Sequence, residues 1–272
     1  MCAILLLTLQ LTAKSTMAML SKNGISATIQ LLLARFKLVR GEQEIKFNIT
    51  RDASVGVRMF IRPNHTDACI ANETILEGTY FKDYDADKFA NLRTIVDIGA
   101  NIGAFTIPAA ALAKNAVVYA FEPENSNADL LERNTILNNL QNIVIERCCV
   151  GAMDDECVLN LNRQSGSHSI VTSLDKVGTQ KARIISFNGF METMPRVDFL
   201  KMDCEGAEYQ IIYSLKKNNL DKIKYMVMEC HPVENESPDA LANYLRQNGF
   251  TITNGKNTTE GIWYCRNKKI SD

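Results

Sequence analysis

The residues best suited to chemistry are concentrated between Asp97 and Thr106, where the chain reads DIGANIGAFT. An apolar run typical of a buried strand precedes this stretch, and a helical pattern follows it. Gly99 and Gly103 would let the backbone pass close to a ligand, where a Cβ atom would clash. Ligands of open α/β sheets bind beyond the carboxyl ends of the strands, so this turn is predicted to contact one.

The spacing of the turn separates two classes of cofactor. A dinucleotide site usually has GxGxxG, which presents a helix amino terminus to a pyrophosphate. Here the spacing is GxNxG, and Asp97 lies two positions before the first glycine. A carboxylate at that position would repel phosphate but would suit the ammonium group of a methionine moiety. The turn therefore favours S-adenosyl-L-methionine over a nicotinamide dinucleotide.

The ends of the next two predicted strands add to this prediction. Glu122 ends the second strand, directly before Pro123, and a carboxylate there could accept both hydroxyls of a ribose. Cys148 and Cys149 end the third strand, where the backbone and apolar contacts could reach the edge of an adenine. A glycine turn alone could be a tight connection without a ligand. Combined with Glu122, it predicts a nucleoside site.

Four further polar residues follow predicted strands at the same edge: Asp203, Glu205, Glu229 and His231. If the methyl group of such a cofactor is transferred to a hydroxyl, that hydroxyl must lose its proton, and a nearby base would take it. We predict Asp203, Glu205 and His231 as catalytic residues. The alternatives are that Asp203 binds backbone amides, that Glu205 and Glu208 cap the following helix, and that His231 is an ordinary loop residue.

The pattern of apolar residues supplies the elements that would position these groups. Buried strands that alternate with helices predict an α/β, Rossmann-like fold: a mainly parallel, seven-stranded sheet with helices on both faces and an antiparallel hairpin at its C-terminal edge. A further hairpin is expected around 158–161 and 183–187. The predicted strands are 94–98, 117–121, 143–149, 197–202, 224–228, 250–253 and 262–265, and the helices are 105–114, 127–138, 207–217 and 238–248.

Composition excludes several classes of protein. The formal net charge of the 272 residues is −1, so no bulk attraction to polyanions is expected, and we predict no nucleic-acid partner. The eight cysteines include no CxxC pair and no Cys/His cluster, and we predict no metal site. Several cysteines lie in apolar runs, as reduced thiols of a cytoplasmic protein do.

The N-terminal region differs from the rest. The apolar run 3–12 is too short to span a bilayer, so no obligatory membrane insertion is expected. The first fifty residues contain six Lys or Arg and two Glu, which leaves loose association with a membrane surface open. Apolar residues at helical spacing predict an accessory helix at 28–40.

From about Asp67 to Phe250, the chain resembles the FkbM family of methyltransferases. The most particular match is the Lys-x-Asp-x-Glu-Gly-x-Glu block that begins at Lys201. The glycine turn, by contrast, is shared by many methyltransferases. The matching pieces are Asp67 through Tyr80, DIGANIGAFT, Tyr119 through Pro123, Asn134 through Asn142, Asp198 through Glu208, and Met228 through Pro232.

The resemblance implies a class I methyltransferase fold, S-adenosyl-L-methionine as cofactor, and O-methylation of a hydroxyl on a sugar, glycan or small natural-product-like acceptor. A non-catalytic scaffold of the same fold and an NAD(P)-dependent oxidoreductase are the alternatives. The segment 165–169 departs from the family pattern and is expected to shape the acceptor site. The residues expected at the cofactor are Asp97, Gly99, Ala100, Asn101, Gly103, Phe105, Thr106, Glu122, Pro123, Cys149 and Asp203.

These expectations divide the chain into two parts. Residues 1–54 are predicted to be an N-terminal extension with the accessory helix, and residues 55–272 the methyltransferase domain. The cofactor-binding core is expected at about residues 92–265. The sequence does not indicate an oligomeric state.

Overall fold

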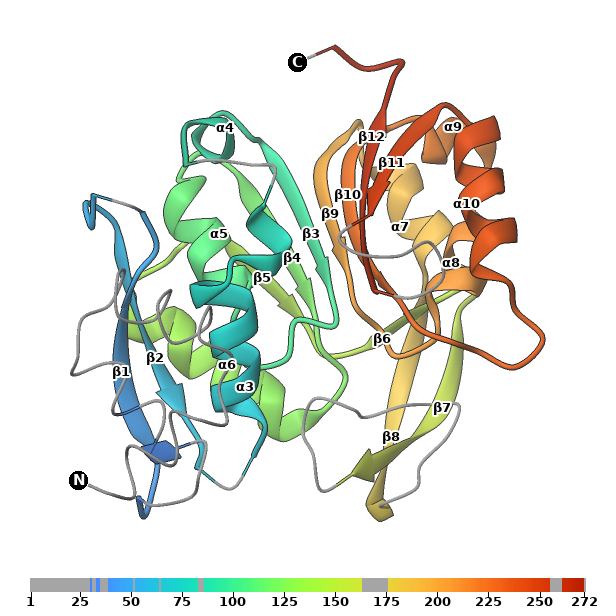
Figure 1. Ribbon diagram of the computed structural model, residues 1–272. Coiled ribbons are helices and arrows are strands. Elements are labelled where there is room, and N and C mark those ends of the chain that lie inside the picture. Colours follow the sequence, from blue (N-terminus) through green and yellow to red (C-terminus); the bar gives the residue numbers. More distant parts are fainter. Residues whose placement is uncertain are drawn as a thin grey trace.

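A computed structural model describes residues 30, 33–34, 39–50, 52–63, 65–82, 86–162, 176–254 and 261–271. Its centre is a seven-stranded sheet in the order β11-β12-β10-β9-β3-β4-β5 (Figure 1). These strands are β3 (Thr94–Ile98), β4 (Val117–Phe121), β5 (Ile143–Glu146), β9 (Val197–Met202), β10 (Ile223–Cys230), β11 (Phe250–Asn254) and β12 (Gly261–Asn267).

The directions of the strands match the predicted mainly parallel sheet. Pairs β5–β4, β4–β3, β3–β9 and β9–β10 are parallel, whereas β12 runs antiparallel to both β10 and β11. All six residues of β9 are buried, as expected of a central strand covered on both faces. The parallel strands therefore bring the residues that follow β3, β4, β9 and β10 to one edge.

Helices cover both faces of this sheet. On one face, α4 (Ala86–Ala90) and α5 (Thr106–Leu112) pack on side chains such as Ile95 and Val118, and α6 (Asn125–Leu137) packs in the cluster that contains Ala120. On the other face, α7 (Phe187–Thr193), α8 (Glu208–Ser214) and α10 (Pro238–Gln247) pack on side chains such as Val96 and Leu200. Figure 1 shows the two groups of helices on opposite sides. This arrangement confirms the predicted fold.

Two elements differ from the sequence pattern. The predicted strand at 143–149 is broken after Glu146, where the N–H of Cys148 turns back to the Glu146 carbonyl. Its end, β6 (Cys149–Gly151), joins a separate sheet with β7 (Asp155–Asn162) and β8 (Lys176–Ser186). The predicted helix 207–217 ends at Ser214 because Leu215 is extended, and α9 (Lys217–Leu220) follows. The expected extra hairpin is confirmed as β7 and β8, which pair antiparallel.

The region before β3 lies over α5 and α6. The hairpin of β1 (Gln43–Asn48) and β2 (Gly56–Ile61) packs on the same apolar cluster as α6. It is followed by α3 (Asp67–Ala71), a π-helical turn η1 (Asn72–Leu76) and a 3₁₀ turn η2 (Thr79–Phe81). The proposed division after residue 54 falls in the loop between two paired strands and remains a proposal.

Most of the predicted accessory helix at 28–40 lies outside the described residues, although residues 30, 33 and 34 are helical. The segment 165–169, expected to shape an acceptor site, also lies outside them. Among the described residues, no helix combines the length and apolar character needed to cross a bilayer.

Candidate active site

The glycine turn between β3 and α5 is bound to the end of β4. The N–H groups of Gly99 and Ala100 both donate to the carbonyl oxygen of Phe121 at 3.0 Å. The N–H of Asn101 donates to Glu122 Oε2 at 2.8 Å. Asn101 has a φ of 50°, a left-handed conformation that asparagine adopts more readily than most residues. The two strand ends singled out in the sequence are therefore in direct contact.

The fold itself requires glycine at positions 99 and 103, because the backbone is left-handed there and a Cβ atom would clash. Gly99 has a φ of 77°, and a Cβ there would lie 1.9 Å from the backbone oxygen of Asp203. Gly103 has a φ of 90°, and a Cβ there would lie 2.5 Å from Leu131 Cδ1. The sequence predicted a close approach to a ligand at these glycines, whereas the close neighbour that the structure shows at each of them is another part of the chain.

Asp97 is buried beneath the glycine turn and stabilises it through contacts with other residues. Its side chain is fully buried, and its oxygens contact Thr106 Oγ1 at 2.5 Å and Lys201 Nζ at 3.2 Å. Lys201 also donates to the Gly99 carbonyl at 2.6 Å. Burial alone would lower the pKa of Lys201, but attraction to Asp97 and Asp203 outweighs it and raises the pKa. The expected contact between Asp97 and a ligand ammonium group is therefore replaced here by an ion pair with Lys201.

A cleft that is partly open to solvent lies beyond the turn. Asp97, Gly103 and Thr106 are not among its lining residues, whereas the other residues predicted for the cofactor are. Those lining it are Gly99, Ala100, Asn101, Phe105, Glu122, Pro123, Cys149 and Asp203, together with Glu205.

The cleft also has walls that the predicted set of cofactor residues does not include. Ile70, Thr74 and Tyr80 line it from the segment 67–80, and Leu159 lines it from the β7–β8 hairpin. The only signal for Ile70 and Thr74 was the resemblance of that segment to the family. Asn127, in the first turn of α6, also lines the cleft and accepts a hydrogen bond from Arg62 at 2.6 Å.

Glu122 lies in the wall of the cleft with little exposure. Its Oε2 accepts from Asn101 and its Oε1 accepts from the N–H of Glu124, both at 2.8 Å. Burial raises the pKa of Glu122 to about 7, although these two hydrogen bonds act to lower it. The carboxylate therefore holds the glycine turn in place and also borders the cleft.

The other end of the cleft is acidic. The Tyr80 hydroxyl donates to Asp203 Oδ2 at 2.9 Å and to Glu229 Oε2 at 3.2 Å. Burial and repulsion from Asp203 raise the pKa of Glu229. Burial, together with repulsion from Glu229 and Asp203, also raises the pKa of Glu73. Glu73 is a further residue that the sequence pattern did not single out. This concentration of negative charge suits a cationic group.

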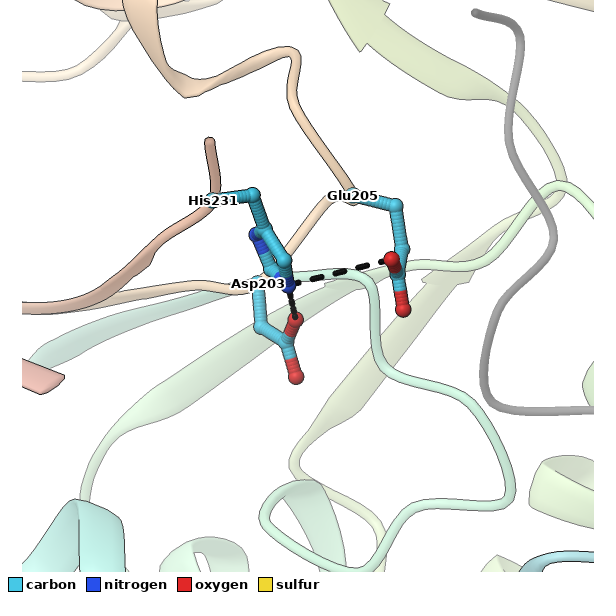
Figure 2. A group of neighbouring side chains, drawn as sticks. All are labelled: Asp203, Glu205 and His231. Carbon is cyan, nitrogen blue, oxygen red and sulfur yellow. Dashed lines mark ion pairs between the residues drawn. The ribbon is translucent and has the colours of Figure 1, made fainter. Parts of the chain in front are cut away.

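The predicted catalytic residues Asp203, Glu205 and His231 lie together at this end (Figure 2). His231 Nε2 is 3.9 Å from Asp203 Oδ1 and 3.7 Å from Glu205 Oε2. Burial raises the pKa of Glu205 to about 7, and His231 partly offsets this. One donor atom from each residue lies within 4.8 Å of the others, so these three could share a divalent cation. The sequence prediction of no metal site did not anticipate this grouping.

These pKa shifts predict that the unliganded protein loses stability as the pH rises from about 4.5 to about 9. The folded pKa values of Glu122 and Glu205 are raised from 4.5 to about 7, so their ionisation above pH 4.5 costs folding free energy. His231, raised from 6.5 to about 9, stabilises the fold fully below 6.5 and loses that contribution as the pH rises through 9.

Urea unfolding across this range tests the prediction, with Glu122→Gln as the comparison. The variant should show a shallower fall between pH 4.5 and 7 than the native chain. A free energy of unfolding that rises across the whole range would contradict the assignment.

The order of the sheet, its antiparallel end and the glycine turn beside a cleft define a class I methyltransferase fold. The family model of the methyltransferase FkbM domain matches residues 97–252, more than half of the chain. The chain belongs to the FkbM methyltransferase family. It is therefore a methyltransferase, as predicted.

Individual relatives are distant. Methyltransferase 1 of Beauveria bassiana (strain ARSEF 2860) is 26% identical over 193 residues, covering 63% of this chain and 77% of that protein. Methyltransferase sdnD of Sordaria araneosa is 24% identical over 203 residues, covering 62% and 78%. Among solved structures, the METTL16 MTase domain has a TM-score of 0.49 at 14% identity, covering 89% of this chain and 78% of that one.

Proposed function

We propose that this protein transfers a methyl group from S-adenosyl-L-methionine to a hydroxyl of a sugar, glycan or other small-molecule acceptor. The observation that carries the proposal is a single cleft that is lined by Gly99, Glu122 and Asp203, from the ends of three neighbouring parallel strands. Such a cleft offers one ligand a carboxylate at each end and a close-packed backbone turn between them.

Each part of the cofactor has a candidate partner. Glu122 would accept the ribose hydroxyls, and Cys149 and Val150 would border the adenine. The acidic end around Asp203 would attract the ammonium and sulfonium groups. In this assignment Asp97 acts indirectly, because its ion pair with Lys201 orients the carbonyl of Gly99.

The reaction needs little beyond positioning and a proton acceptor. Transfer from a sulfonium is an in-line displacement, so a cleft that aligns donor and acceptor supplies much of the acceleration. In this assignment the transferred methyl group would lie near Asp203, Glu205 and His231, and one of them would receive the acceptor proton.

Calorimetric titration tests the cofactor assignment, with NAD⁺ as the comparison. We expect saturable binding of S-adenosyl-L-methionine and none of NAD⁺. Formation of S-adenosylhomocysteine is then measured with sugars, glycosides and simple alcohols as acceptors. Binding without product across neutral acceptors, combined with turnover of amines, would overturn O-methylation while preserving the cofactor.

Asp203→Asn is expected to lower turnover by about tenfold and to weaken cofactor affinity by much less, because one hydrogen-bonded charge is removed at the reacting end. Asp129→Asn, on the exposed face of α6, is the control and should change neither value. Turnover of Asp203→Asn equal to that of the control would remove this residue from the mechanism.

We further propose that the protein acts in the reducing environment of the cytoplasm, on an acceptor that is not a nucleic acid. In support, the seven cysteines in the described part of the chain are free thiols. The net charge of −1 gives no general attraction to a polyanion.

A further inference from the structure

Two consecutive residues at the start of α8 hold His231. The carboxylate of Glu208, which is 0% exposed, lies with Oε1 3.0 Å from His231 Nδ1. The hydroxyl of Tyr209 donates to the backbone oxygen of His231 at 3.0 Å. Both the imidazole and the backbone of His231 are therefore tied to the same turn of helix.

The contacts of Glu208 are not those of a helix cap. Ala207 is the N-cap of α8 and makes no side-chain capping hydrogen bond. Glu208 Oε1 instead accepts from the N–H of Cys204, outside the helix, at 3.1 Å. The alternative prediction, in which Glu208 caps the helix, therefore does not describe its hydrogen bonds.

Among the described residues, the cationic partner of Glu208 is His231. In the described ranges its carboxylate forms no ion pair with Lys or Arg, and its Oε2 is buried without a hydrogen bond. A buried carboxylate is costly unless it is paired, and here the imidazole is its partner. Because the carboxylate accepts from Nδ1–H, the second nitrogen, Nε2, is left as the basic atom of the neutral ring.

Nε2 faces Asp203 and Glu205, which line the cleft, although His231 itself is not among the lining residues (Figure 2). Its distances to Asp203, Glu205 and Glu229 are 3.9, 3.7 and 4.0 Å. All three are too long for hydrogen bonds, so these carboxylates do not occupy the lone pair of Nε2. An acceptor hydroxyl could therefore approach that atom.

We propose that Glu208 and His231 form a dyad in which Nε2 of His231 takes the proton of the acceptor hydroxyl and Glu208 is the positioning residue. This inference rests on the function proposed above. As the hydroxyl oxygen forms its bond to the methyl carbon, the carbon–sulfur bond breaks and its electron pair stays on sulfur. The O–H bond gives its proton to Nε2, and the resulting imidazolium is stabilised by Glu208 and releases the proton to solvent.

The charges around the ring favour its protonated form. Burial alone would lower the pKa of His231, but Glu208, Asp203 and Glu205 together raise it to about 9, and Glu229 faces the same nitrogen. A bound sulfonium, being positive, would act in the opposite direction and lower this pKa.

Nuclear magnetic resonance of ¹⁵N-histidine in the unliganded protein, with EDTA present, tests the dyad without cofactor or acceptor. The chain has three histidines, and His231→Gln assigns the signal. We expect the neutral ring to carry its proton on Nδ1. In Glu208→Gln, which keeps an oxygen of similar position but no charge, the pKa of His231 should fall by about one unit or more.

Glu192→Gln is the matched control, because Glu192 is an exposed carboxylate that pairs with Lys216 instead. It should leave the titration of His231 unchanged. A neutral His231 protonated on Nε2, or equal pKa values in Glu208→Gln and the control, would overturn the proposal. If Glu208→Gln does not fold, the tautomer of His231 in the native chain still tests the proposal.

Kinetics separates the dyad from a merely structural role. With an acceptor that supports turnover, the rising limb of kcat/KM against pH should move to lower pH in Glu208→Gln by the same shift as the titration. A uniform loss of rate with an unmoved limb would contradict the dyad. A native chain that does not bind S-adenosyl-L-methionine would instead refute the proposed function, independently of the tautomer.

Discussion

Gly99→Ala is expected to lose at least about 3 kcal/mol of folding free energy and to lose cofactor binding with it. The added Cβ would lie 1.9 Å from the backbone oxygen of Asp203. That oxygen belongs to the loop after β9, which cannot retreat without breaking the hydrogen bond from the Asp203 N–H to the Ile98 carbonyl. The strain would separate the two central strands at the site itself. Urea unfolding followed by circular dichroism measures the loss.

Gly41→Ala is the control for conformational strain alone. Its φ of 75° matches the 77° of Gly99, but a Cβ at Gly41 would meet nothing within 4 Å. The cost of the left-handed conformation by itself is about 1 to 2 kcal/mol. If the two variants were equally stable, the close contact between Gly99 and Asp203 would not exist in solution.

Glu122→Ala is expected to weaken S-adenosyl-L-methionine binding by about a hundredfold, equivalent to about 2.7 kcal/mol. Two losses would combine in this variant. The ribose hydroxyls would lose their charged acceptor, and Asn101 would lose the oxygen that holds the glycine turn. Because the pKa of Glu122 is about 7, affinity in the native chain should also fall as the pH drops below 7. Calorimetry measures both effects.

Glu124→Gln provides the comparison for cofactor affinity. Glu124 is a neighbouring buried carboxylate that caps α6 through the N–H groups of Ser126 and Asn127, and it is absent from the lining of the cleft. Its loss should lower stability but leave cofactor affinity nearly unchanged. Equal affinities for Glu122→Ala and Glu124→Gln would rule out Glu122 as a cofactor ligand.

The positions of most site residues along the chain could be predicted because they depend on local rules. A parallel strand ends where its apolar run ends, and the polar residue that follows lies at the carboxyl edge of the sheet. This rule placed Glu122, Asp203 and His231 at one edge before any contact was known. A glycine turn is equally local, because φ above zero is a property of one residue.

Local rules were therefore enough to predict the succession of strands and helices along the chain, the glycine turn and the edge at which the site forms. Which groups meet at that edge depends on tertiary packing. Asp97 contacts Lys201, and His231 contacts Glu208 from another element. Tyr80 reaches Asp203 from 123 positions away. Periodicity reports which face a side chain occupies, whereas the partner on that face depends on how separate elements pack, and no spacing along the chain encodes that directly.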